Sequence, residues 1–298
     1  MKYLNFLENY LTKEYTFFKD TIIRQREFFG KKWEKNFDAE LEKFFFNDFD
    51  KLKLAIKGYC AFALDGMKLQ SKFNQTKEYI NKTYEEASSE VYQNRDYMMN
   101  LYLPGIYLSH FLWRHHYLQH IFFKKKFLKL ALKKRGKLFF DIGIGTGFYS
   151  KEMLLNIPSV KGQGFDLSPF SIKHTQDMLK KFNLKNRYKL NKMDIIKKKP
   201  KEKSDYLVCI EVLEHLEDPL LFLKNINLMM KKNGLGLISA AINAPNADHI
   251  YLYRSYLDVK KQLVDAGFKI IDFINDKAYE ERSKDELVPV NAAFIVTK

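Results

Sequence analysis

The sequence is poor in cysteine and arginine and has no long charge-free apolar run. Its two cysteines, Cys60 and Cys209, are too few for a disulfide framework and lack metal-site spacing, as expected of a reduced, cytoplasmic protein. The net charge of +15 rests mainly on scattered Lys, since only eight of the 51 basic residues are Arg. Nucleic acid is disfavoured as a partner, because base and phosphate recognition relies on Arg forks. We expect no membrane span and no signal peptide.

Proline is nearly absent from the first part of the chain. Pro104 is the only proline in the first 130 or so residues, which also lack strand-like alternation. Apolar residues recur at helical spacing in windows 41–49, 55–73 and 107–132. The sequence therefore predicts a helical N-terminal region or lid at residues 1–128 and a second domain at 129–298, without a low-complexity linker between them.

The most informative stretch, residues 139–148, reads Phe-Phe-Asp-Ile-Gly-Ile-Gly-Thr-Gly-Phe. An apolar run ends in Asp141, then Gly143, Gly145 and Gly147 precede a helical pattern. Glycine lets a ligand approach the bare backbone and tolerates positive φ. The third glycine comes one position too early for the dinucleotide fingerprint Gly-x-Gly-x-x-Gly. The carboxylate at the strand end would repel a pyrophosphate but would suit a cationic, methionine-type amine.

Polar segments follow three further predicted strands. A strand at 161–166 ends in Asp166, nineteen positions after the last glycine, where an acid can accept both ribose hydroxyls. A strand at 187–192 is followed by Asp194 and Ile195. A strand at 206–210 opens into the string Glu-Val-Leu-Glu-His-Leu-Glu-Asp-Pro.

Together these motifs resemble the class I S-adenosylmethionine-dependent methyltransferases, and the last string is similar to that of small-molecule members of the ubiquinone-biosynthesis type. The resemblance covers roughly residues 130–298. It implies an α/β, Rossmann-like, seven-stranded sheet whose antiparallel last strand lies between strands five and six. The rest of the chain fits this topology with predicted strands at 234–242, 268–274 and 291–297 and a helix at 251–266.

The resemblance implies S-adenosyl-L-methionine as the cofactor. Asp141 and the glycines would shape the methionine pocket, Asp166 would bind the ribose and Asp194 the adenine edge. A turn-forming role for Asp194 is an open alternative. The full set of expected cofactor residues is Asp141, Gly143, Gly145, Gly147, Asp166, Leu167, Asp194, Ile195, Glu211 and Tyr102.

Residues after strands four and five are expected to border the methyl acceptor, because strand C-termini line the ligand crevice in open α/β sheets. The predicted catalytic residues are His249, His215 and Asp248, and Asn246 and Arg254 are predicted to bind the acceptor. Two structural alternatives stay open. His215 could pack a helix, and the Asn-Ala-Pro-Asn segment could be a turn in which Asp248 caps the next helix.

Aromatic and histidine side chains crowd the segment before the glycine loop. They are Tyr92, Tyr97, Tyr102, His110, Trp113, Arg114, His115, His116, Tyr117 and His120. A buried packing layer accounts for most of them, and Tyr97, His115 and His116 are candidates to bind the acceptor. His116 and His120 are spaced i, i+4, but no third ligand accompanies them, so no metal is predicted.

The leading prediction is a methyltransferase that acts on an oxygen or nitrogen atom of a small-molecule metabolite, with His249 or His215 assisting deprotonation. One alternative is an RNA or protein methyltransferase that docks through the basic helical region. Another is a non-catalytic module that keeps the fold. The aromatic N-terminal helices also leave surface for a homodimer.

Overall fold

The computed structural model describes residues 1–80, 83–86 and 95–298. The helical N-terminal part contains α1 (Lys2–Glu14), α2 (Thr21–Phe45), α3 (Phe49–Thr76), α5 (Arg95–Tyr97), α6 (Leu103–Leu112) and α7 (Arg114–Phe122). π-Helical turns at Met98–Tyr102 and Phe123–Phe127 lead into α6 and into α8 (Leu128–Lys134). Within the described residues, no helix is both long and apolar enough to cross a membrane.

Local chemistry sets the breaks between these helices, two of which fall inside predicted helical windows. Window 41–49 contains the end of α2 and the start of α3, where Asp48 caps α3 by accepting from the Lys51 amide at 3.1 Å. Window 107–132 is interrupted at Trp113, whose extended backbone (φ −99°, ψ 127°) separates α6 from α7. Helix is therefore confirmed in all three windows, two of which span a break between neighbouring helices.

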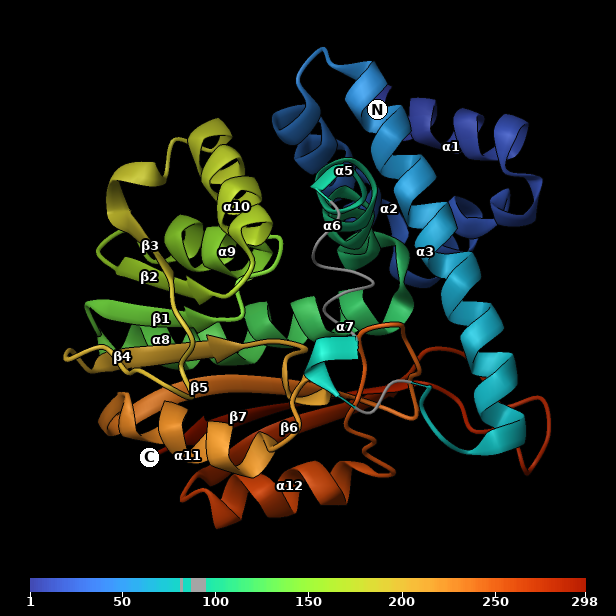
Figure 1. The fold of residues 1–298 in the computed structure, drawn as a ribbon. Helices are drawn as coiled ribbons and strands as arrows, with labels where there is room; N and C mark the ends of the chain where they lie inside the picture. Colours follow the sequence, from blue (N-terminus) through green and yellow to red (C-terminus); the bar gives the residue numbers. More distant parts are fainter. Residues whose placement is uncertain (81–82, 87–94) are drawn as a thin grey trace.

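The C-terminal part is built on one seven-stranded sheet of order β3-β2-β1-β4-β5-β7-β6 among the described residues (Figure 1). Its last strand, β7, runs antiparallel to both β5 and β6. This confirms the predicted fold class. The strands are β1 (Leu138–Ile142), β2 (Lys161–Asp166), β3 (Tyr188–Lys192), β4 (Ser204–Cys209), β5 (Met230–Ile242), β6 (Lys269–Lys277) and β7 (Val290–Thr297).

The predicted helix at 251–266 begins later than the sequence pattern indicated. The observed helix α12 spans Tyr256–Asp265, and Tyr253 instead forms a β-bridge with Ile242. A capping box explains the start, because Ser255 accepts from the Asp258 amide while the Asp258 carboxylate accepts from the Ser255 amide. Asp248 therefore does not cap this helix, which removes one of the alternatives left open by the sequence.

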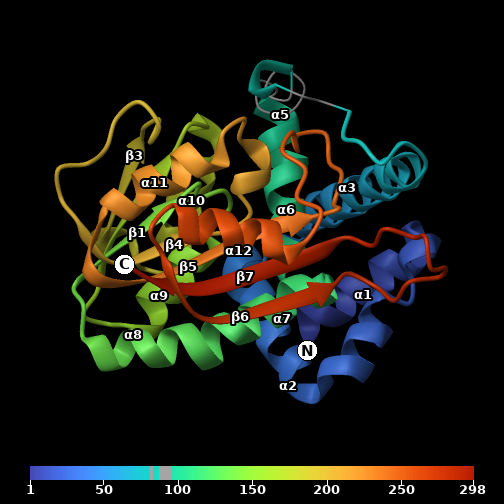
Figure 2. The same ribbon diagram turned by 90° about the horizontal axis from the view of Figure 1, so that it is seen from below.

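Helices cover both faces of the sheet, and alternate strand residues separate two cores. Phe139 packs in the core shared with the N-terminal helices, α9 (Phe148–Asn156) and α10 (Pro169–Lys181). Phe140 belongs to the opposite core, which contains residues of α11 (Pro219–Leu228) and α12. Figure 2 shows α11 and α12 on one side of the strands and α7 and α8 on the other. The alternation sorts side chains onto the two faces. Because β1 to β5 pair in parallel, their carboxyl ends lie at one edge of the sheet.

The N-terminal helices are fastened to that edge by specific contacts. Gln70 of α3 donates to the Leu287 carbonyl at 2.6 Å, and the Ala244 amide donates to the Tyr79 hydroxyl at 3.0 Å. The fully buried ammonium of Lys151 on α9 forms ion pairs with Glu40 of α2 and with Glu152. The helical part is thus held over the strand ends.

Candidate functional site

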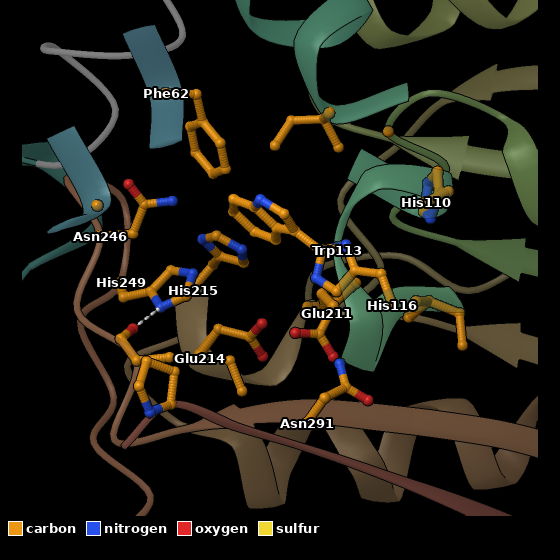
Figure 3. A pocket seen from close by; sticks show the side chains of 18 of the residues that line it. Phe62, His110, Trp113, His116, Glu211, Glu214, His215, Asn246, His249 and Asn291 are labelled. Atoms are coloured by element: carbon orange, nitrogen blue, oxygen red, sulfur yellow. Dashed lines mark hydrogen bonds between the residues drawn. The ribbon is translucent and has the colours of Figure 1, made fainter. Parts of the chain in front are cut away.

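One cavity of about 1590 Å³ lies between the sheet edge and the N-terminal helices. The loops after β1, β2, β3, β4 and β5 line one side, and α3, α6 and residues around Trp113 line the other. Figure 3 shows side chains from both parts of the chain entering the same space. The cavity joins the glycine loop to the segments that follow β4 and β5.

The three glycines of the loop after β1 all have positive φ but serve different purposes. The φ angles are 70° at Gly143, 48° at Gly145 and 74° at Gly147. A Cβ on Gly143 would lie 2.5 Å from Val212, and one on Gly147 would lie 2.6 Å from Thr175. A Cβ on Gly145 would meet nothing within 4 Å. Gly143 and Gly145 line the cavity, whereas Gly147 lies outside it and permits close packing of α9 on α10.

Asp141 lies in the cavity wall, but its carboxylate is already bonded. It is only 3% exposed, and it accepts a hydrogen bond from the Ser150 hydroxyl on α9. Burial raises the pKa of Asp141 to about 7. The expected anionic anchor is thus a buried group bonded to a serine on α9.

Asp166 and Asp194 brace the loops in which they lie. The Asp166 carboxylate accepts from the Gly145 amide at 3.1 Å and the Ser168 amide at 2.8 Å, and burial raises its pKa. Asp194 accepts from the Ile196 amide at 2.9 Å, the turn-forming contact considered as its alternative role. Both acids line the cavity, as do the expected cofactor residues Leu167 and Ile195.

The segment after β4 places two glutamates in the cavity wall. Glu211 has a left-handed backbone (φ 52°), and its carboxylate accepts from the Ser239 hydroxyl at 2.6 Å. Glu214 is fully buried, and neither of its carboxylate oxygens has a hydrogen-bond partner among the described residues. Burial raises the pKa of both groups, and the charge of Glu211 raises that of Glu214 further. Sequence reasoning missed Glu214, although it stands in the string that carried the family resemblance.

His215 and His249 meet beside Glu214, with ring centroids 4.7 Å apart. His215 Nδ1 lies 2.8 Å from the Asp248 carbonyl, and His249 Nδ1 lies 2.5 Å from the Ala244 carbonyl. A carbonyl oxygen can only accept, so both imidazoles carry a proton on Nδ1. Burial lowers the pKa of His249 to about 4, so its ring is neutral at physiological pH.

Besides Gly147, three predicted catalytic or acceptor-binding residues lie outside the cavity lining. Asp248 is 1% exposed and accepts from the Tyr102 hydroxyl at 2.7 Å, so it positions a cavity residue instead of lining the cavity itself. Arg254 donates to the Lys77 carbonyl at 3.2 Å. Tyr97 packs against Tyr102 with ring centroids 5.9 Å apart. Tyr92 lies outside the described residues.

The remaining predicted acceptor residues, Asn246, His115 and His116, line the cavity. Burial lowers the pKa of His115 to about 3 and that of His116 well below its usual range, so both rings are neutral. Sequence reasoning gave no site role to Phe62 and Trp113, which stack at 5.3 Å and face the same space (Figure 3). The acceptor side is therefore bounded by aromatic and neutral imidazole rings.

Comparisons with known proteins agree with this architecture. A family model described as a methyltransferase domain matches residues 140–235. A ubiquinone biosynthesis O-methyltransferase of Pelagibacter ubique is 32% identical over 111 residues, which is 37% of this chain and 44% of that protein. The corresponding protein of Coxiella burnetii is 26% identical over 126 residues, 42% of this chain and 52% of that protein. The chain thus spans about half the length of the curated relatives it matches.

A solved structure extends the likeness to most of the chain. An O-methyltransferase family protein from Burkholderia thailandensis covers 87% of this chain and 76% of its own, with a TM-score of 0.55 and 13% sequence identity. At that identity the match shows the fold alone. The predicted resemblance to class I methyltransferases of the small-molecule type is confirmed for the α/β part of the chain.

Proposed function

We propose that this chain is an S-adenosylmethionine-dependent methyltransferase that methylates an oxygen or nitrogen atom of a small-molecule metabolite. The observation that carries the proposal is the single cavity running from the glycine loop to His215 and His249. Its volume of about 1590 Å³ exceeds the ~300–1,000 Å³ of an ordinary ligand pocket, which suits a cofactor and an acceptor bound together. The matched methyltransferase domain and the O-methyltransferase relatives support the same reaction class.

The residues at the glycine-loop end fit the proposed cofactor. The space above Gly145 is open where a side chain would stand, so bare backbone can contact the methionine half. Asp166 is oriented by two backbone amides, and each of its oxygens keeps a lone pair for a ribose hydroxyl. Ile195 and Asp194 would border the adenine. When bound, S-adenosylmethionine supplies an electrophilic methyl group. The electron pair of the broken carbon–sulfur bond stays on sulfur, and the acceptor atom supplies the pair of the new bond.

The other end of the cavity would orient the acceptor and remove its proton. His215 and His249 line the cavity, each with its Nδ1 proton held by a backbone carbonyl, and Phe62 and Trp113 offer flat apolar walls. We propose that the helical region 1–128 acts as a lid that keeps water from this space while residues 129–298 bind the cofactor. A cytoplasmic location and a homodimer stay predictions of the sequence.

A thermal-shift experiment tests the proposal. S-adenosylhomocysteine at about a hundred times its Kd should stabilise the chain by about 2.7 kcal/mol, seen as a rise in Tm. The Asp166→Asn variant should lose most of that shift. The Asp177→Asn variant, which removes an exposed carboxylate on α10 paired with Lys173, should keep it. No shift at saturating ligand would overturn the assignment.

A further inference from the structure

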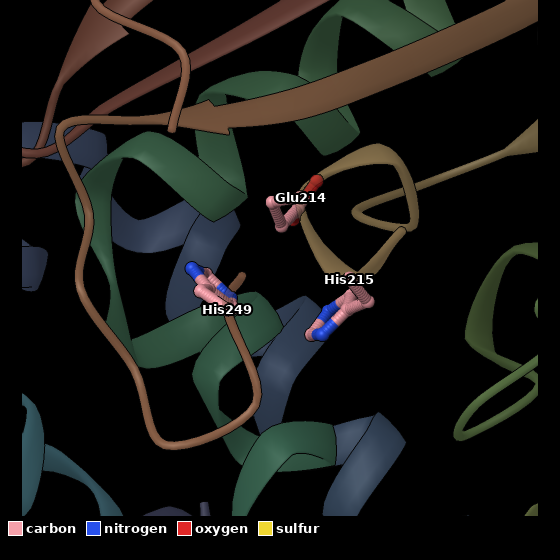
Figure 4. Close-up of side chains that lie close together, drawn as sticks. All are labelled: Glu214, His215 and His249. Carbon is pink, nitrogen blue, oxygen red and sulfur yellow. The ribbon is translucent and has the colours of Figure 1, made fainter. Parts of the chain in front are cut away.

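The structure brings Glu214, His215 and His249 together in a way that the proposed reaction does not require. The ligand-type atoms of these three side chains all lie within 4.8 Å of one another. The ligand atoms of one tetrahedral ion at bond lengths of about 2.1 Å stand about 3.4 Å apart, so the widest pair would have to close by about 1.4 Å at most. Figure 4 shows the three side chains side by side on the loops after β4 and β5.

Backbone contacts hold these two loops together. The Glu214 carbonyl accepts from the amides of both Ile250 and Tyr251 at 2.9 Å. The turn Leu213–His215 is thereby clamped to the chain just after His249. The three side chains therefore share a rigid support, as a preorganised binding site requires.

The two imidazoles are oriented as metal ligands usually are. Each donates its Nδ1 proton to a backbone carbonyl, of Asp248 for His215 and of Ala244 for His249. A metal-bound histidine almost always donates its second ring N–H to such an acceptor, which fixes the tautomer and frees the other nitrogen for the ion. The pattern occurs here twice, on two rings whose centroids lie 4.7 Å apart.

Glu214 adds an independent observation that calls for a ligand. Its side chain is fully buried in the cavity wall, and among the described residues neither oxygen has a hydrogen-bond partner. Neither Glu214 nor the neighbouring Glu211 forms an ion pair with a Lys or Arg that the structure describes. A buried carboxylate without a partner is costly unless a proton or a cation compensates it.

We propose that Glu214, His215 and His249 bind one divalent transition-metal ion. Two imidazoles and a carboxylate are a ligand set that suits Zn²⁺, Fe²⁺ or Mn²⁺, and three protein ligands leave coordination positions open. All three residues line the cavity, so the open positions face the space assigned to the acceptor. An acceptor that binds there through an oxygen atom would lose its proton more readily.

The proposed function is needed to say that the open coordination positions face the methyl acceptor. The binding of the ion itself does not depend on it. With the ion bound, His215 and His249 would hold it through Nε2, and the proton of the acceptor would pass to the Glu211 carboxylate, which also lines the cavity. The acceptor class narrows accordingly to molecules with an oxygen that can coordinate a metal.

Direct binding measurements test the site without any turnover. The full chain, freed of metal with a chelator, is titrated with Zn²⁺ and separately with Mn²⁺ by equilibrium dialysis. We expect one ion per chain, with a Kd raised at least tenfold in both Glu214→Gln and His249→Gln. The His115→Gln variant, which removes another histidine of the cavity lining, should bind the ion like the unaltered chain.

Absence of stoichiometric binding of both ions, or unchanged binding by Glu214→Gln, would overturn the proposal. A cooperative thermal unfolding transition, measured without ligand on the same preparations, verifies that each variant is folded. The shift of that transition by S-adenosylhomocysteine separates the two hypotheses. Ion binding without a cofactor shift would contradict the proposed function alone, and a cofactor shift without ion binding would contradict the metal site alone.

Cobalt substitution tests whether the ion is open to the cavity. Co²⁺ bound at the site should change its visible spectrum when acetohydroxamate, a small oxygen chelator, is added. An unchanged spectrum would mean that the coordination sphere is closed and that the acceptor cannot reach the ion.

Discussion

The two ends of the cavity differ in how their polar groups are satisfied. At the glycine-loop end the acids are bonded to their own surroundings, with Asp166 held by two amides and Asp141 by Ser150. At the other end Glu214 is buried with both oxygens unpaired among the described residues. The polar groups of the first end are hydrogen-bonded before any ligand binds. At the second end, the Glu214 carboxylate would gain a partner only when a ligand binds. Functional sites commonly carry such locally unfavourable groups, which the rest of the fold stabilises.

The largest expected effect comes from adding a side chain at Gly147, where the glycine loop packs against α10. Gly147→Ala places a Cβ 2.6 Å from Thr175 on a backbone with φ 74°. Steric overlap and left-handed strain together should lower the free energy of unfolding by about 3 kcal/mol. Denaturant unfolding checks this, and a variant as stable as the parent would show that the loop is not packed as described.

The matched substitution Gly145→Ala should separate stability from binding. No atom lies within 4 Å of the added Cβ, so only the strain of φ 48° remains, about 1 kcal/mol. Because the new methyl group enters the cavity, the S-adenosylhomocysteine thermal shift should nevertheless be lost. A preserved shift would place the cofactor elsewhere.

Removing the charge of Asp166 should weaken the binding of S-adenosylhomocysteine without unfolding the chain. Asp166→Asn deprives the ribose of a charged acceptor, worth about 1.5–3 kcal/mol, or roughly ten- to a hundredfold in Kd. Isothermal titration measures the change. Equal affinity in the variant would mean that Asp166 serves only its loop.

The buried acid Asp141 predicts a pH dependence of stability. Its pKa is raised to about 7 from 3.8, so its contribution to folding is fully present below pH 3.8 and is lost as the pH rises to 7. The Tm of Asp141→Asn, relative to the parent, should therefore increase between pH 4 and pH 7 and then level off. Parallel plots of Tm against pH for the two proteins would contradict the raised pKa of the buried Asp141 carboxyl.

The smallest expected effect is the change in stability on replacing Glu214, at the end of the cavity away from the glycine loop. In the metal-free chain at pH 8, Glu214→Gln replaces an unpaired buried carboxylate next to Glu211 with a neutral amide. We expect the free energy of unfolding to rise by about 1 kcal/mol, opposite in sign to most buried substitutions. A clear loss of stability would show that Glu214 already has a stabilising partner.

The same contrast explains how far the sequence could be read. The glycine loop and Asp166 follow from local spacing, because strand, turn and helix signals there lie within one βαβ unit. The strand order was predicted from the resemblance to class I methyltransferases. The sequence did not single out Glu214, because its proposed role as a metal ligand depends on His249. That residue follows β5 and comes close to Glu214 only in the folded chain. Asp248 and Tyr102 were both selected, but only the structure pairs them. The break at Trp113 is made by one residue with an extended backbone inside a run of helical apolar spacing, which periodicity does not record.

The most direct test of the account is a crystal structure of the chain with S-adenosylhomocysteine. We predict that its amino-acid half lies on the backbone of Gly143 and Gly145, its ribose beside Asp166, and its sulfur facing the group of His215 and His249. Density for the ligand at any other place, or an empty glycine loop at saturating concentration, would contradict the proposed enzyme.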